Sequence, residues 1–128
     1  MPFVRMTVSG PTLTPKQVAL LHTEITQLMA SVLGKRADLT SVLVEQPVTA
    51  SWAVGGTPAK VAAHVEATIT AGTNLPEEKA RFIEKSMRLL RSVLGSELNP
   101  ATYVVVNEVS ANSWGYDGRT QESRTLAV

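Results

Sequence analysis

The stretch SWAVGG at residues 51–56 returns as SWGYDG at residues 113–118, displaced by 62 positions. The chain contains only two tryptophans, and each follows a serine at the start of one of these stretches. The tripeptide VLG also occurs twice, at residues 32–34 and 93–95, with a displacement of 61 positions. Matches this specific at a near-constant offset indicate that one supersecondary unit is written twice in the chain.

Other positions of the two halves align at the same offsets: Val4 with Val65, Pro15 with Pro76, Val42 with Val104 and Gly56 with Gly118. The length of 128 residues suits one domain with a substantial core. We therefore predict a single domain over residues 1–128, built from repeats at about residues 2–56 and 63–118. A short linker near residues 57–62 joins them.

Each repeat is predicted to fold as strand, helix and strand. Residues 3–8 alternate apolar and polar side chains, as a strand with one buried face does. A helix start follows, with Thr14 as the cap, Pro15 in the first turn and Gln17 completing a capping box. The apolar stripe of this helix is Val18, Leu21, Ile25, Leu28 and Val32. Residues 40–45 are the predicted second strand.

The second repeat gives the same order. Residues 64–70 and the β-branched run at residues 102–106 are the predicted strands. Between them, Asn74 is the predicted helix cap, with Glu77 three residues on. The apolar face of this helix is predicted to contain Phe82, Leu89 and Val93.

A strand–helix–strand unit of this length fits a parallel β-α-β crossover. We therefore predict an α+β fold in which tandem β-α-β units form a four-stranded sheet with two helices on one face. The other face of the sheet needs a cover, and three such sheets packed around a trimer axis would supply it.

Composition narrows the classes of function. A net charge of +1 without a basic run argues against a nucleic-acid partner. The absence of cysteine excludes disulfides, thiolate metal sites and a cysteine nucleophile. No His, Asp and Glu spacing suggests a metal site. No apolar stretch approaches the roughly 20 residues of a membrane span, and no signal-peptide pattern is present. We expect a cytoplasmic protein without a membrane partner.

Pro2 is the residue with the most distinctive chemistry. A small second residue favours removal of Met1, which would leave a secondary amine on a rigid ring. An ordinary α-amino group titrates near ~8, and burial or a nearby cation lowers that pKa. A neutral amine near pH 7 can act as a general base or as a nucleophile. The alternative is that Pro2 is only a terminal proline.

Pro2 ahead of a strand, the β-α-β unit and the glycine-containing tails at residues 52–56 and 114–118 together resemble the tautomerase superfamily. The closest group is the 4-oxalocrotonate tautomerase family. The resemblance covers nearly the whole chain twice, so the chain is similar to a fused, double-length member. Short members assemble as hexamers, and the resemblance therefore implies a homotrimer.

The resemblance also implies an activity. In the family, the proline nitrogen is the base that moves a proton between carbon and oxygen of an enol or dienol acid. Pro2 is then the catalytic residue of a keto–enol tautomerase, an isomerase that needs no cofactor, acting on a small carbonyl or enol acid. The second repeat has Ala63 at the matching position. Its internal amide nitrogen cannot be a base, so we expect one proline site per chain.

The chain departs from the family at the carboxylate-binding arginines. Short members hold the substrate with an arginine before the helix and another in the second strand, and neither repeat has an arginine there. Because a bidentate guanidinium clamp is not easily replaced, we do not expect the dicarboxylate 4-oxalocrotonate as substrate. Two cations remain as candidates. Arg119 either reaches back to a carboxylate or is a solvated loop charge. Arg5 either lowers the pKa of the Pro2 amine and binds an anion, or pairs with a neighbouring acid at a subunit contact.

Three aromatic residues are candidates for substrate binding. Trp114 and Trp52 match the pocket aromatic of the family and are either pocket walls or packing anchors. Tyr103 is either a hydrogen-bond donor to a substrate oxygen or an aromatic that favours a strand.

Two other functions stay open. A dehalogenase, hydratase or decarboxylase of the same superfamily would need a partner for the proline. Glu45 and Glu108, near the ends of the second strands, either serve as that partner or are solvated carboxylates at the edge of the sheet. A non-catalytic ferredoxin-like binding domain also has this order of elements.

Overall fold

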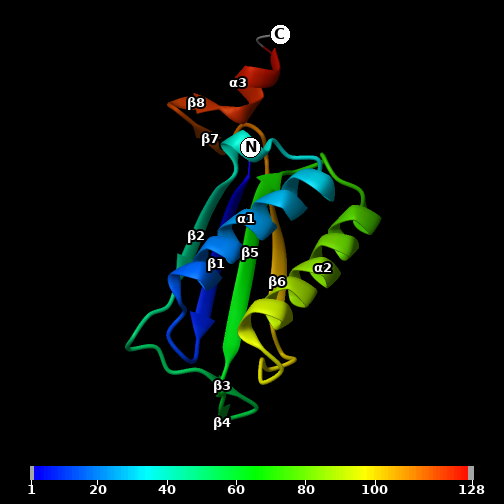
Figure 1. The fold of residues 1–128 in the computed structure, drawn as a ribbon. Helices are drawn as coiled ribbons and strands as arrows, with labels where there is room; N and C mark the ends of the chain where they lie inside the picture. The colour runs from blue at the N-terminus through cyan, green and yellow to red at the C-terminus, as the bar shows by residue number, and fades with distance from the viewer. Residues whose placement is uncertain (1, 127–128) are drawn as a thin grey trace.

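A computed structural model of the chain describes residues 2–126 (Figure 1). Its central sheet has four strands: β1 (Phe3–Ser9), β2 (Ser41–Glu45), β5 (Ala62–Thr70) and β6 (Tyr103–Val109), in the spatial order β2-β1-β5-β6. The pairs β1–β2 and β5–β6 are parallel, whereas β1 and β5 are antiparallel. The predicted α+β fold, with tandem β-α-β units sharing one sheet, is confirmed.

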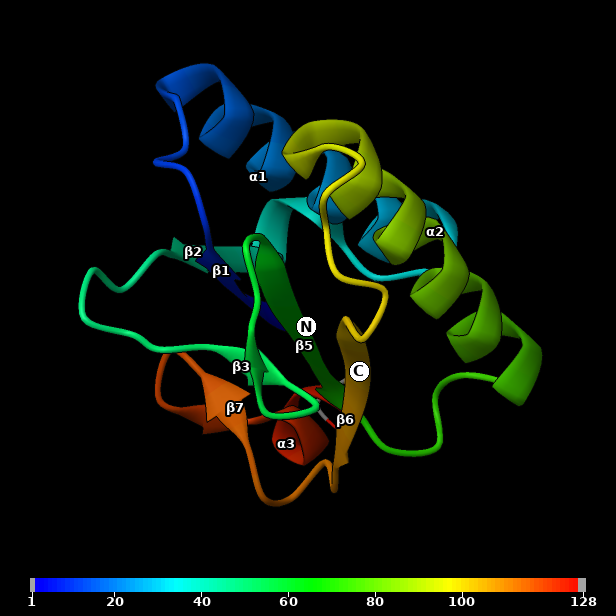
Figure 2. The same cartoon turned by 90° about the horizontal axis from the view of Figure 1, so that it is seen from below.

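Both long helices cover the same face of the sheet, α1 (Pro15–Ser31) and α2 (Pro76–Leu94) (Figure 2). The predicted capping box of α1 is present. Thr14 Oγ1 accepts the backbone N–H of Gln17 at 3.1 Å, and Gln17 Oε1 accepts that of Thr14 at 2.8 Å. A one-turn 3₁₀ helix, η1 (Ala37–Leu39), connects α1 to β2.

The start of α2 differs from the prediction by one residue. Leu75, not Asn74, occupies the cap position, and the carboxylate that accepts its N–H at 2.7 Å is that of Glu78, not Glu77. The physical reason is that the Asn74 side chain is used elsewhere. Its amide donates to the carbonyl of Leu33 at 2.9 Å and so ties the start of α2 to the end of α1.

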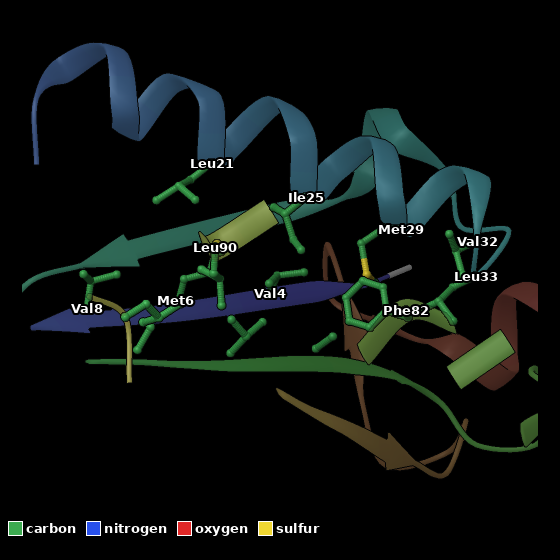
Figure 3. Close-up of a cluster of buried hydrophobic side chains, with 14 of the residues drawn as sticks. Val4, Met6, Val8, Leu21, Ile25, Met29, Val32, Leu33, Phe82 and Leu90 are labelled. Carbon is green, nitrogen blue, oxygen red and sulfur yellow. The ribbon is translucent and has the colours of Figure 1, made fainter. Parts of the chain in front are cut away.

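The core lies between the helices and the sheet (Figure 3). Its fully buried members include Val4, Met6, Val8, Leu21, Ile25, Met29, Val65, Ile69, Phe82 and Leu90. Two predicted stripe positions are shifted: Met29 and Leu90 are fully buried, while Leu28 and Leu89 are only partly so. The reason is that α1 and α2 also pack side by side, and Leu28 and Leu89 line the groove between them.

In the described part of the chain, residues 2–126, no helix covers the opposite face of the sheet (Figure 2). The strand register aligns its side chains in rows across the four strands, for example Glu45, Thr7, His64 and Tyr103. Large apolar side chains are exposed on this face, namely Phe3, Leu43, Tyr103 and Val105. In one chain this face is therefore an uncovered mixture of apolar and charged groups.

A short hairpin follows each β-α-β unit: β3 (Ala53–Val54) with β4 (Thr57–Pro58), and β7 (Gly115–Tyr116) with β8 (Arg119–Thr120). Both two-residue loops have positive φ at both positions, 60° and 79° at Gly55 and Gly56, and 50° and 77° at Asp117 and Gly118. This is the mirror-image turn that suits a twisted hairpin. The predicted linker near residues 57–62 thus contains β4 and the first residue of β5.

Because β1 and β5 are antiparallel, the hairpin of each repeat lies at the end of the sheet where the other repeat begins. Hairpin β7–β8 and the final helix α3 (Gln121–Leu126) lie at the end of the sheet where the N-terminus lies (Figure 1). Hairpin β3–β4 lies at the opposite end, where β5 begins. Each repeat therefore supplies the hairpin beside the start of the other.

No helix within residues 2–126 is long and apolar enough to cross a membrane.

Candidate active site

Pro2 lies at the amino end of β1 with less than 2% of its surface exposed. Its carbonyl oxygen accepts the backbone N–H of Ser41 at 3.2 Å. This bond continues the parallel pairing of β1 and β2, in which Phe3 pairs with Ser41, toward the N-terminus. The start of the chain is therefore held as part of the sheet and does not extend freely from it.

A pocket of about 360 Å³ opens beside Pro2. Its lining residues are Pro2, Phe3, Ser41, Thr68, Trp114, Gly115 and Tyr116. The first four come from the ends of three adjacent strands, and the last three come from the second hairpin. The second repeat thus supplies four of the seven lining residues, Thr68, Trp114, Gly115 and Tyr116. The lining includes the hydroxyl-bearing residues Ser41, Thr68 and Tyr116.

The aromatic wall is tightly built. Trp114 Nε1 donates to Thr70 Oγ1 at 3.1 Å, which fixes the indole against the end of β5. Gly115 approaches β8 so closely that a Cβ atom would lie 1.9 Å from the carbonyl oxygen of Arg119. Only glycine fits at that position without moving the hairpin.

A cation that sequence reasoning missed lies at this end of the sheet. Arg36, just before η1, forms two hydrogen bonds with Asp38, at 3.1 and 2.6 Å. Its pKa is raised chiefly by the hydrogen bond to Asp38, with smaller contributions from the Asp38 charge and from the phenol of Tyr116. Arg36 lies in the connection that leads to Ser41, a lining residue of the pocket, and its side chain is 69% exposed.

Arg119 lies beside the pocket and does not line it. It lines a neighbouring hollow of about 350 Å³ that shares Trp114 and Gly115 with the Pro2 pocket. Among residues 2–126, its guanidinium makes one long hydrogen bond, 3.4 Å, to the carbonyl of Ser123. The sequence-based candidate is therefore near the site, in the adjacent hollow.

Arg5 lies on the helix-free face of β1 and is paired within the chain. Its Nε donates to Glu45 Oε1 at 2.7 Å, and Thr7 Oγ1 donates to the same oxygen at 2.9 Å. These two hydrogen bonds, that of Arg5 first, hold the pKa of Glu45 below its usual range. Arg5 is thus paired with an acid, but the acid is in the same chain and not across a subunit contact.

Tyr103 and Trp52 lie at the opposite end of the sheet from Pro2. Tyr103 pairs with His64, which in turn pairs with Thr7 near the end of β1. Trp52 immediately precedes β3 and accepts the N–H of Ala59 at 3.0 Å. For either residue to contact a substrate at Pro2, the pocket would have to belong to a neighbouring subunit.

The two candidate carboxylates are occupied by cations. Glu45 is bound by Arg5, and Glu108 accepts from Lys79 Nζ at 2.6 Å. Neither lines the Pro2 pocket. Within residues 2–126, no group of three metal-ligating side chains is brought together.

Sequence reasoning missed Ser41, Thr68, Tyr116 and Arg36. A signal for Ser41 and Arg36 was available, because a parallel crossover brings the start of its second strand next to the start of its first. Thr68 and Tyr116 could not be found this way. Their positions depend on how the second repeat pairs with the first.

A larger hollow, about 490 Å³, lies between the solvent sides of α1 and α2. Its walls are apolar residues with Glu24, Lys85 and Arg88 at the rim. We assign the candidate site to the smaller pocket because that one contains the ring of Pro2 and an aromatic wall.

The sequence model of the family described as "Tautomerase enzyme" matches residues 2–62, which span the first repeat. A probable tautomerase of Dickeya dadantii is 34% identical over 56 residues, 44% of this chain and 84% of that protein.

Two solved structures illustrate the shared fold. One is a wild-type fused 4-OT, solved as a symmetric trimer, with a TM-score of 0.81 at 17% identity over 95% of this chain and 98% of that chain. The other belongs to the cis-3-chloroacrylic acid dehalogenase family, with a TM-score of 0.74 at 19% identity over 97% and 91%. The fold of the whole chain is thus that of the fused 4-OT structure, and the sequence matches show that the chain belongs to the tautomerase family.

Proposed function

We propose that this protein is a proline-dependent keto–enol tautomerase that acts on 2-oxo or 2-hydroxydienoic acids or on related enol acids. The observation that carries the proposal is the burial of Pro2 in a pocket whose far wall is Trp114. A buried amine is easier to keep uncharged than an exposed one, because desolvation disfavours the ammonium form. The uncharged form is the one that can accept a proton.

In the proposed reaction, Pro2 nitrogen takes the hydroxyl proton of the enol and returns a proton to a carbon of the dienol chain. No atom is lost or gained overall, which is why no cofactor is required. The step needs a free amine. While Met1 is attached, the nitrogen of Pro2 is a tertiary amide without basicity, so removal of Met1 is a condition of activity.

The substrate carboxylate requires a cation near the pocket. Arg36 is the candidate that the strand pairing favours, since it precedes the strand whose first residue is bonded to Pro2. Arg119, in the adjacent hollow, is the second candidate. Replacing each by methionine distinguishes them, because loss of the carboxylate partner raises KM more than it lowers kcat.

The composition of the pocket favours a tautomerase over a dehalogenase or hydratase. Those reactions need a group that activates water or stabilises charge beside the proline. Among residues 2–126, the seven that line the pocket include no carboxylate. Proton transfer by a single base does not need one.

The helix-free face of the sheet supports a homotrimer. Exposed Phe3, Leu43 and Val105 on this face would be covered if three sheets packed around an axis. The related fused 4-OT is described as a symmetric trimer. Sedimentation should then give three times the chain mass of 13.7 kDa, and a species of one chain mass would contradict the assembly.

The test of the activity combines intact mass with a ketonisation assay on 2-hydroxymuconate and phenylenolpyruvate, comparing the wild-type protein with Pro2→Ala. We expect a mass without Met1, measurable ketonisation, and a loss of about 10²–10⁴-fold in kcat/KM in the variant. Lys16→Ala, a change at an exposed position of α1 away from the pocket, is the matched control.

If Met1 is absent and neither protein ketonises either substrate, the tautomerase proposal fails for these acids. A dehalogenase-like or decarboxylase-like reaction, or a non-catalytic trimer, would then be the better description. Equal activity in the wild-type protein and Pro2→Ala would contradict the proline-base mechanism directly.

A further inference from the structure

We infer that Arg124, on the final helix α3, is a positioning residue that fixes the aromatic wall Trp114–Tyr116 against Pro2. The inference rests on the proposed function for its kinetic consequence, but its structural part can be tested without any activity. It concerns a segment beyond residue 118, where the repeated part of the chain ends.

Arg124 binds Tyr116 in two ways. Its Nη2 donates to the carbonyl oxygen of Tyr116 at 2.8 Å, and its guanidinium carbon lies 3.8 Å from the centre of the Tyr116 ring. A charge-assisted hydrogen bond and a cation–π contact from one side chain hold both the backbone and the ring of the same residue. The Nε of Arg124 is buried and has no hydrogen-bond partner among residues 2–126, so the guanidinium is enclosed at this place.

The other end of the wall is also bonded to α3. The N–H of Gln121 donates to the carbonyl of Trp114 at 2.9 Å, and the N–H of Glu122 donates to the carbonyl of Ala111 at 2.8 Å. The three successive wall residues are therefore held on both sides of Gly115 by one short helix (Figure 1). Arg124 is the member of this set whose contact depends on a side chain.

The hairpin needs such support. Its strands contain two residues each, and an isolated two-stranded hairpin is marginal in water. A wall that moved away from Pro2 would widen the pocket and admit water. Arg124 acts on the reaction through Tyr116 and Trp114 and does not line the pocket itself.

The equivalent hairpin at the other end of the sheet is built without this device. Its Trp52 carbonyl accepts the N–H of Ala59, as Trp114 accepts that of Gln121. The position of Tyr116 is taken by Val54, which has no ring for a guanidinium to stack on. After β4 the chain enters β5 and forms no helix. The clamp thus occurs only at the end that contains the proline, among the residues the structure describes.

The test uses the full chain with Trp52→Phe, which leaves Trp114 as its one tryptophan. Arg124→Met keeps the length of the side chain and removes its charge, fork and stacking plane. We expect acrylamide quenching of Trp114 emission to rise about twofold, and KM for phenylenolpyruvate to rise about tenfold with kcat changed less than about threefold. The matched control is Arg88→Met, which breaks an exposed ion pair with Glu84 on α2 and should change neither quantity.

Arg124→Lys is the second variant, in case Arg124→Met does not fold. Lysine keeps the charge but lacks the planar fork. Acrylamide quenching of Trp114 should therefore still rise, by about half of the increase expected for Arg124→Met. Wild-type quenching in a folded Arg124→Met protein, or in Arg124→Lys when Arg124→Met does not fold, would overturn the inference. A protein with no activity but with the expected quenching changes would sink the proposed function while the positioning role stands.

Discussion

Pro2 and Ala63 begin equivalent strands of the two repeats, and both are buried, with 2% or less of their surface exposed. The start of β1 lies at the end of the sheet with hairpin β7–β8, and the start of β5 lies at the end with hairpin β3–β4 (Figure 1). They differ in covalent chemistry: the nitrogen of Ala63 is an internal amide, whereas that of Pro2 becomes an amine when Met1 is removed. Equivalent positions in one fold therefore do not give equivalent sites, because the reactive group here is the chain terminus itself.

The two tryptophan hairpins also differ, and the one beside Pro2 has more structural support. The one beside Pro2 contains a glycine at the close approach to its partner strand, a tyrosine, and a helix that follows it. The one at the Ala63 end has Ala53 and Val54 at the matching positions and continues directly into β5. These additional contacts occur at the end of the sheet where removal of Met1 produces a reactive amine.

The largest effect should come from making Pro2 resemble Ala63 chemically. A two-residue extension ahead of Pro2 turns its nitrogen into an amide while keeping the ring. We expect kcat/KM to fall by about 10²–10⁴-fold, as measured by ketonisation of phenylenolpyruvate, with an unchanged thermal midpoint. An extended protein with more than about a tenth of wild-type activity would mean that the amine is not the base.

A smaller effect is expected from the two tryptophans. Trp114→Ala removes the pocket wall and should lower kcat/KM by about tenfold to a hundredfold, equivalent to about 1.4–2.7 kcal/mol. Trp52→Ala is the counterpart at the Ala63 end. If each Pro2 pocket is formed by one chain, this change should lower kcat/KM much less. A loss in Trp52→Ala as large as that in Trp114→Ala would show instead that Trp52 contacts the pocket of a neighbouring subunit.

The two hairpins can also be compared by exchanging glycine and alanine. Gly115→Ala places a methyl group against the carbonyl of Arg119 and should lower the free energy of unfolding by about 2 kcal/mol. Ala53→Gly, the reverse change in the other hairpin, should cost only about 0.5–1 kcal/mol through chain entropy. Urea unfolding measures both values, and equal costs would contradict the tighter packing of the second hairpin.

The smallest expected effect is on the loss of stability at low pH, which depends on the capping residue at the start of each helix. The pKa of Glu78 is lowered, first by the hydrogen bond from the Leu75 N–H and then by that from Asn74. A lowered carboxyl pKa contributes stability that is complete above the ordinary value, about 4.3, and is lost as the pH falls through the folded value. The equivalent residue of α1, Gln17, is neutral and has no such dependence.

Glu78→Gln should therefore reduce the loss of stability between about pH 5 and 3, and Gln17→Glu should increase it. The midpoints of urea unfolding at pH 5 and pH 3, compared between each variant and the wild-type protein, measure this change. Other lowered carboxyls, such as Glu45 and Glu108, form a background common to all variants. Identical pH dependence in both variants and the wild-type protein would rule out the cap as its source.

Local features of the fold were predictable because they are encoded by neighbouring residues. The capping box at Thr14 and Gln17 depends on four residues, and it forms as predicted. The alternation in β1 reports one buried face, and Val4, Met6 and Val8 are indeed buried. The error at Asn74 arose because its side chain bonds to Leu33, a partner far away in the sequence.

The composition of the site was predictable only in part. Pro2 and Trp114, two of the candidates, line one pocket. Arg5 and Tyr103 looked equally suitable by residue type, but one is paired with Glu45 and the other lies at the opposite end of the sheet. Residue type cannot distinguish these outcomes, because the distance from Pro2 depends on which strands pair and in which direction.

The sequence by itself determined the repeat, the strand–helix–strand order and the chemistry available at the terminus, since periodicity, turns and covalent bonding are local properties. Only the tertiary structure decided that β1 and β5 pair in opposite directions, so that the second repeat's hairpin stands beside Pro2. It also brought Arg124 onto Tyr116. The physical reason is that strand pairing is chosen by how two apolar faces bury each other in one core, a property of the whole chain that no single segment encodes.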